Sequence, residues 1–254
     1  MGRIPESEFE KLYNLGVTYF DSGKYEKAIE CFDKVIELEP NNSSAWTNKG
    51  TLLSLLRKYQ EAIKCYDKAI EMDPKNARAW YNKGEVLSST TSARGLFINN
   101  QDRYDAIDCF KKVIELDPRN AAKAWVNIAK VLAGLNIKKN SNDIIMCCDA
   151  ALDNQGTEIS DTGESFPYQF YAYLQKAQVF FELEKYKETF ECCDKVLEIN
   201  PKLKVAWEMK AYAARKLKKH EEALKCYEKI LELDPENYGA QYEAKKEREY
   251  ISKH

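Results

Sequence analysis

Apolar and small residues recur along this chain at the spacing of an α-helix. Trp46, Gly50 and Leu53 fall at i, i+4 and i+7, so they share one face of a first helix. A second set with the same spacing follows at Ala62, Tyr66 and Ala69. Two successive amphipathic helices predict a hairpin, and the small residues are expected where its two helices approach closely.

The hairpin pattern returns with a period of 34 residues. Pro40 lies 34 residues before Pro74, and Pro201 lies 34 residues before Pro235. Each proline follows a second helix, which it cannot continue. One hairpin cannot bury its apolar faces alone, so the copies are expected to stack. The pattern therefore predicts an all-α solenoid of antiparallel helix hairpins.

The pattern divides the chain into six units and a capping helix. The units span residues 9–42, 43–76, 77–120, 121–154, 170–203 and 204–237. The charged stretch 238–254 is predicted to cap the last unit, with Gln241 where the units carry an aromatic residue. Two insertions interrupt the series, at 88–103 and 154–166. Because a solenoid grows by addition, residues 1–254 are predicted to form a single domain.

Six positions of the unit match those of a known repeat. In the second unit they are Trp46, Gly50, Ala62, Tyr66, Ala69 and Pro74. The tetratricopeptide repeat family has an aromatic residue, Gly or Ala, Ala, a second aromatic residue, Ala and Pro at these places, so the chain resembles that family closely. The resemblance implies a right-handed superhelix whose first helices line a concave groove, and it implies that this groove binds extended peptides.

A row of amide side chains lies on the predicted groove face of the first helices. It consists of Asn14, Asn48, Asn82 and Asn127, with Gln175 next in line. An amide offers both a donor and an acceptor, so stacked amides can bond the backbone of an extended chain whatever its side chains. Similar peptide-binding arrays use such ladders. The alternative is that asparagine is a common filler at this position.

Charged and aromatic residues on the same face favour an acidic peptide as the ligand. The cations are Arg78, Lys123 and Lys130 in the middle of the chain and Arg215 at its far end, and the aromatic residues are Tyr171, Phe181 and Tyr212. A basic surface attracts acidic peptides, and aromatic rings provide pockets. The carboxylate clamp of co-chaperone arrays is not matched, because its first-unit Lys and Asn and its arginine are missing.

A lysine stands at a position where this family often has leucine. It occurs as Lys49, Lys83, Lys176 and Lys210. We expect a structural role, in which the aliphatic stem covers the edge of the core while the amine reaches water.

Eight cysteines are present, and most of them mark one position of the unit. The aligned residues are Cys31, Cys65, Cys109, Cys147, Cys192 and Cys226. Equivalent sites in stacked hairpins lie roughly 10 Å apart, which is beyond the reach of a disulfide. We therefore expect packed, reduced thiols and a reducing compartment.

The two insertions each allow two interpretations. The first is a tolerated polar loop, but its apolar segment 96–98 (Leu, Phe, Ile) could instead fold over the groove or dock a partner. The second contains Glu158, Asp161 and Glu164 and no lysine or arginine, which is typical of a flexible acidic connector. It could alternatively be a self-peptide that occupies a basic groove.

The composition and the motifs of the chain argue against nucleic-acid binding, membrane association and catalysis. Lysine and arginine number 39 against 41 aspartates and glutamates, so no basic excess points to nucleic acid. No secretory segment and no run of about 18 apolar residues is present, so we expect no membrane association and a cytoplasmic location. Both histidines, His220 and His254, are expected to be exposed, and no phosphate loop, nucleophile motif or metal-ligand spacing occurs. We therefore expect no catalysis, cofactor or metal.

Two functions are compatible with this sequence. The first is a protein–protein interaction scaffold or adaptor that binds an extended peptide or partner segment in the groove. The alternative is a scaffold that self-assembles through the segment 96–98 or the exposed end of the array, so that a homo-oligomer is possible.

Overall fold

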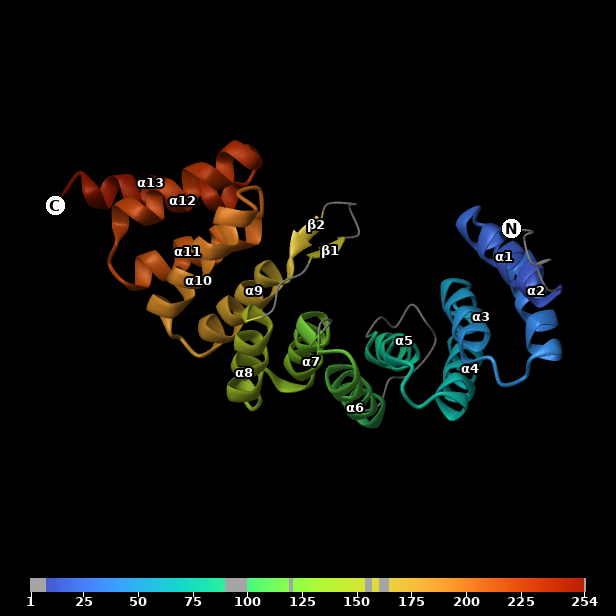
Figure 1. Cartoon of the computed structure of the whole chain (residues 1–254). Coiled ribbons are helices and arrows are strands. Elements are labelled where there is room, and N and C mark those ends of the chain that lie inside the picture. The colour runs from blue at the N-terminus through green and yellow to red at the C-terminus, as the bar shows by residue number, and fades with distance from the viewer. Residues whose placement is uncertain (1–7, 90–99, 119–120, 154–156, 160–164, 254) are drawn as a thin grey trace, which may run out of the picture. The chain divides into compact units, whose positions relative to one another are not determined.

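The computed structural model describes residues 8–89, 100–118, 121–153, 157–159 and 165–253. In this part of the chain it contains thirteen α-helices and two short strands (Figure 1). The helices are α1 (Glu8–Asp21), α2 (Tyr25–Leu38), α3 (Ser43–Leu55), α4 (Tyr59–Met72), α5 (Ala77–Ser88), α6 (Asn100–Leu116), α7 (Ala121–Asn136), α8 (Ser141–Leu152), α9 (Tyr168–Glu182), α10 (Tyr186–Ile199), α11 (Lys204–Lys216), α12 (His220–Leu233) and α13 (Tyr238–Ile251). None of the described helices combines the length and the apolar character needed to cross a bilayer.

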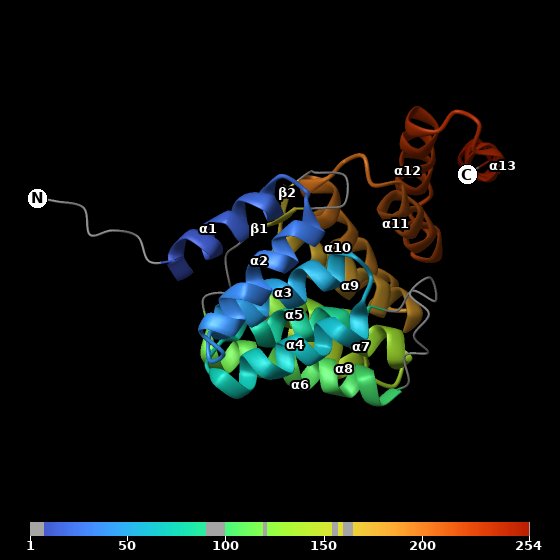
Figure 2. The ribbon, with the colours of Figure 1, turned by 90° about the vertical axis from the view of Figure 1, so that its right-hand side faces the viewer.

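Packing divides the chain into two compact units, residues 1–120 and 121–254. Unit 1 holds the hairpins α1/α2, α3/α4 and α5/α6, and unit 2 holds α7/α8, α9/α10 and α11/α12 followed by α13. Within each unit the second helix of one hairpin packs on the first helix of the next (Figure 2). The predicted all-α array of hairpins is confirmed. That the whole chain acts as one domain stays a prediction.

The helices of a hairpin approach closely where the sequence places a small residue. A Cβ atom added to Gly50 would lie 2.6 Å from Cε1 of Tyr66, whose ring is fully buried. At Gly84 an added Cβ would lie 2.9 Å from Cε1 of Phe110. Glycine is therefore required at these two places by the neighbouring ring.

In α3, α5 and α11 a tryptophan bonds the first helix to the loop before it. The indole Nε1 of Trp46 donates to the carbonyl oxygen of Pro40 at 2.9 Å, and the bond recurs at Trp80 and Trp207 with the equivalent prolines. In α13 the amide Nε2 of Gln241 donates to the oxygen of Pro235 at 2.8 Å. The capping helix therefore keeps the anchor of a repeat without its aromatic ring.

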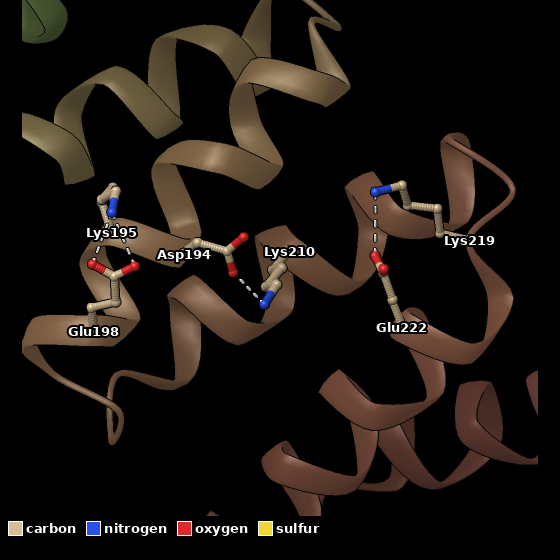
Figure 3. Close-up of polar contacts among 6 residues, drawn as sticks. All are labelled: Asp194, Lys195, Glu198, Lys210, Lys219 and Glu222. Atoms are coloured by element: carbon tan, nitrogen blue, oxygen red, sulfur yellow. Dashed lines mark hydrogen bonds and ion pairs between the residues drawn. The ribbon is translucent and has the colours of Figure 1, made fainter.

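The four repeat-position lysines have the structural role predicted for them, but their amines do more than reach water. Each ammonium pairs with an aspartate on the second helix of the preceding hairpin. The pairs are Lys49–Asp33 (2.5 Å), Lys83–Asp67 (2.6 Å), Lys176–Asp149 (2.5 Å) and Lys210–Asp194, the last of which is drawn in Figure 3. The lysine side chains are only 16–24% exposed, so their stems also cover the core edge. A recurring ion pair thus joins successive hairpins.

All eight cysteines are free and buried, as the sequence predicts for packing thiols. Burial raises the pKa of Cys65, Cys192 and Cys226 to about 11. It raises the pKa of Cys109, Cys148 and Cys193 to about 12. These thiols are therefore protonated at neutral pH.

The insertions differ from their predicted bounds and character. Residues 100–103, assigned to the first insertion, instead form the first turn of α6, where Gln101 donates to Asp105 one turn later. In the second insertion, β1 (Thr157–Ile159) pairs antiparallel with β2 (Ser165–Pro167), so this stretch is not wholly a flexible connector. Glu158 lies in β1. The apolar segment 96–98 and the acidic residues Asp161 and Glu164 lie outside the described residues.

The substitution Gly50→Ala tests the close approach in the second hairpin. Its methyl group would meet the Tyr66 ring, so we expect a loss of roughly 1–3 kcal/mol in the free energy of unfolding, measured by urea denaturation. Gly134→Ala is the matched control, because Gly134 is exposed on α7 and an added Cβ has no neighbour within 4 Å. That control should be stabilising by up to about 1 kcal/mol. Equal effects of the two substitutions would contradict the close-packing account.

Candidate functional site

The amide row of unit 1 is oriented by bonds between first helices. The amide Nδ2 of Asn48 donates to the Tyr13 hydroxyl at 3.0 Å, and that of Asn82 donates to Oγ1 of Thr51 at 3.1 Å. Asn48 is buried, Asn82 is half-buried and Asn14 is exposed. The two bonds join α3 to α1 and α5 to α3. The row therefore helps hold hairpins together, a role that the sequence pattern does not predict.

The amide row of unit 2 is placed differently. Asn127 is buried on α7, and Gln175 is half-buried on α9, whose neighbours include α7 and α11. The Gln175 carbonyl oxygen Oε1 is inaccessible to solvent and accepts no hydrogen bond from the described residues. A buried acceptor without a donor is costly, and because solvent cannot reach this oxygen, a ligand N–H reaches it only if the side chain moves.

The predicted cations lie on three first helices, α5, α7 and α11, and Arg215 is the one on α11. Arg78 is exposed on α5, Lys123 is half-buried on α7, and Lys130 is exposed on α7. The Lys130 ammonium lies 4.9 Å from the ring centroid of Tyr171 on α9, so the structure brings these two predicted residues together.

An aromatic cluster in unit 2 brings two more predicted residues together. The ring centroids of Phe181 and Tyr212 are 5.2 Å apart, and Tyr186 lies 6.0 Å from Tyr212. The Lys216 ammonium lies 5.3 Å from the centroid of Tyr212, which is 40% exposed. The cluster offers a partner apolar rings beside a positive charge.

A pocket of about 500 Å³ shares Tyr212 with this cluster, and we call it the cap pocket. Its lining residues come from α11, α12 and the capping helix. They are Tyr212, Arg215, Lys216, His220, Lys246, Glu247 and Tyr250. Arg215 is the third predicted residue in this region, whereas Lys246, Glu247 and Tyr250 come from a helix expected only to cap the array.

A buried carboxylate organises the wall of the cap pocket. Glu247 Oε1 lies 3.1 Å from Nε of Arg215, and Glu247 Oε2 lies 2.7 Å from Nδ1 of His220. The Glu247 side chain is 5% exposed. Arg215 also pairs with Glu243 at 2.5 Å. Both oxygens of Glu247 are therefore occupied by groups of the chain itself.

His220 is half-buried, which corrects the expectation that it is exposed. Its ring stacks on Tyr250 with centroids 3.8 Å apart and planes 28° apart. The reason is α13, which packs on α12 and covers the histidine. Glu243 and Glu247 stand at i and i+4 on α13, and this spacing is the signal from which the network could have been inferred.

Comparison with protein-family models gives matches over most of the chain. One model described as tetratricopeptide repeat matches residues 9–42, 43–76 and 205–237. A second with the same description matches 65–107, and a third matches 96–120 and 170–203. Comparison with curated proteins gives no match.

Solved structures share the fold at low sequence identity. A structure of YrrB, described as a TPR protein with an unusual peptide-binding site, has a TM-score of 0.62 and 20% identity, over 85% of this chain and 99% of that chain. PilF of Pseudomonas aeruginosa has a TM-score of 0.65 and 15% identity, over 97% of each chain. A tetratricopeptide repeat protein from Parabacteroides merdae ATCC 43184 has a TM-score of 0.62 and 18% identity, over 88% of this chain and 78% of that chain.

The substitution Glu247→Gln tests the buried network. It removes the charge that faces Arg215 and His220, so we expect a loss of roughly 2–4 kcal/mol in the free energy of unfolding, measured by urea denaturation. Glu249→Gln makes the same chemical change at an exposed position of α13 and should stay within about 0.5 kcal/mol of the parent. If Glu247→Gln were as mild as this control, the network would not hold α13.

Proposed function

The chain belongs to the tetratricopeptide repeat family, and from that premise we propose that it is an interaction scaffold that binds an extended segment of a partner protein. Proteins of this family mediate protein–protein interactions. Within each unit the proposed binding surface is the face of the first helices: α1, α3 and α5 in unit 1, and α7, α9 and α11 in unit 2. The related fold of YrrB is described with a peptide-binding site of its own.

The observation that carries this proposal is the fixed orientation of the amides. Asn48 and Asn82 each donate one amide N–H to a hydroxyl group on the first helix of the preceding hairpin. A primary amide has a second N–H and an oxygen with two lone pairs, so groups for a ligand backbone remain. Because the amides are already held, binding a peptide costs little further side-chain entropy.

Charge favours an acidic ligand. Arg78 and Lys130 are exposed, and Lys216 lies over the ring of Tyr212. Positive groups on a binding surface speed association with acidic segments and reject basic ones. The rings of Tyr171, Phe181 and Tyr212 give apolar contacts beside these charges.

The described cysteines are packing residues and are not activated as nucleophiles. In the parts of the chain that the structure describes, no group of three His, Cys, Asp or Glu side chains is arranged to hold a metal ion. The cysteine thiols are buried, and burial raises the pKa of six of them to about 11 or 12, which makes them poor nucleophiles at neutral pH.

Self-assembly is the second candidate, and the exposed tyrosines of the capping helix favour it. Tyr238 is 80% exposed and Tyr242 is 59% exposed. Stacking of a second array on this end is opposed by polar residues, because Gln241, Lys245 and Arg248 stand where the last repeat has Trp207, Ala211 and Ala214. Sedimentation velocity over a wide concentration range separates the candidates, since self-assembly requires a mass that rises with concentration.

The substitution Asn48→Ala tests the amide row against its structural alternative. Peptides are first selected from a random display library with the whole chain, and their Kd is measured by fluorescence anisotropy. We expect Asn48→Ala to weaken binding about tenfold, because a backbone hydrogen bond in a desolvated site is lost. The control is Tyr13→Phe, which removes the hydroxyl that Asn48 bonds but leaves the amide in place.

Tyr13→Phe should keep the Kd within about twofold of the parent, while both variants lose a similar hydrogen bond between helices. Circular dichroism shows whether each variant remains folded. Equal losses of affinity in the two variants would mean that the amide only joins hairpins. No loss in either would remove the row from the binding surface.

A further inference from the structure

We propose that the cap pocket binds a carboxylate of an acidic peptide, through Lys216 of α11 and Lys246 of α13. This inference deepens the proposed function by naming a ligand group and a place for it. It rests on that function only in taking the ligand to be a peptide. The carboxylate could belong to an acidic side chain or to a chain terminus, and the same chemistry recognises both.

The charges that line the pocket are unequal. Three cations, Arg215, Lys216 and Lys246, face a single carboxylate, Glu247. That carboxylate is buried, and Arg215 and His220 occupy its two oxygens. Glu243 also forms an ion pair with Arg215 and so further neutralises the charge of that guanidinium. The positive potential inside the pocket therefore comes from the two lysines.

Both lysines are held over aromatic rings. The Lys216 ammonium lies 5.3 Å from the centroid of Tyr212, and the Lys246 ammonium lies 4.3 Å from that of Tyr242. Among the described residues, no carboxylate lies within ion-pair distance of either amine. The face of an aromatic ring attracts an ammonium group electrostatically, but it does not accept directional hydrogen bonds from the three N–H groups. These donors remain available to a carboxylate.

The pocket wall is built before any ligand arrives. The bonds from Arg215 and His220 to Glu247, and the stack of His220 on Tyr250, tie α11 and α12 to α13. A volume of about 500 Å³ lies in the range of sites for small ligands. A preformed wall lowers the entropy that binding costs. The tyrosine rings also give an apolar surface for the residue beside the carboxylate.

A peptide fits this pocket better than nucleic acid does. Nucleic-acid binding draws its affinity from many phosphate contacts, and the pocket has two available amines in a chain of net charge −2. Two amines and aromatic walls match one carboxylate with an apolar neighbour. An oligonucleotide is therefore a competing probe in the test.

The experiment measures binding of three fluorescent peptides of one length to the whole chain by anisotropy. The first carries glutamates and an amidated C-terminus, the second carries glutamines and a free carboxyl terminus, and the third carries glutamines and an amidated terminus. We expect at least one of the first two to bind and the third not to bind. Raising the salt from about 50 to about 500 mM should weaken binding, because the screening length becomes shorter.

Matched substitutions assign the binding to the pocket. Lys216→Gln and Lys246→Gln should each weaken binding of the carboxylate peptide about fivefold to tenfold, since each removes a charged hydrogen bond. Lys245→Gln makes the same change on the next residue of α13, outside the pocket lining, and should leave the Kd within about twofold of the parent. Circular dichroism verifies that all three variants are folded.

Three results would overturn the inference: equal binding of the neutral peptide, an equal loss in Lys245→Gln, or tighter binding of a single-stranded oligonucleotide. Failure here is distinguishable from failure of the proposed function. If library-selected peptides bind in a way that depends on Asn48 while the carboxylate peptides do not bind, the scaffold function stands and the cap pocket is excluded. If the carboxylate peptides bind through Lys246 and Asn48→Ala has no effect, the pocket stands and the amide row is excluded.

Discussion

The structure depends on one constraint, which is that a two-helix hairpin has more apolar surface than it can bury by itself. Each hairpin therefore needs a neighbour, and two contacts recur at several of the junctions. An indole N–H bonds the proline that ends the preceding second helix, as at Trp46 and Pro40. A lysine of the first helix pairs with an aspartate of that second helix, as at Lys83 and Asp67. Inside the hairpins α3/α4 and α5/α6, a glycine leaves room for an aromatic ring.

The capping helix shows how the same constraint is met where the array stops. Gln241 keeps the bond to the proline carbonyl but brings no aromatic ring. Several repeat units pair a lysine with an aspartate of the preceding helix. In α13 this ion pair is replaced by Arg248, which bonds Glu228 of α12 at 2.9 Å. The inner side of α13 buries Glu247 instead of an apolar residue; Arg215 compensates its charge, and His220 contacts its second oxygen. A helix that ends the core thus also builds a wall of the cap pocket.

Most of the fold could be predicted because its signals are periodic. Four of the predicted repeats begin at residues 43, 77, 121 and 204, and the helices α3, α5, α7 and α11 begin at these same residues. The site was harder to predict because its contacts are not periodic. Asn48 bonds a tyrosine and Asn82 bonds a threonine, so the amide row has no shared partner in the sequence. The β1–β2 ribbon and the extra turn of α6 lie in insertions, where the repeat gives no information.

The central claim is that the first helices form the surface that binds a partner. Hydrogen exchange of the whole chain, measured by mass spectrometry with and without a library-selected peptide, tests it most directly, because it reports every helix at once. The account predicts slower exchange on peptide binding in first helices such as α3, α5, α9 and α11. Slower exchange confined to the second helices α4, α6, α10 and α12 would contradict it.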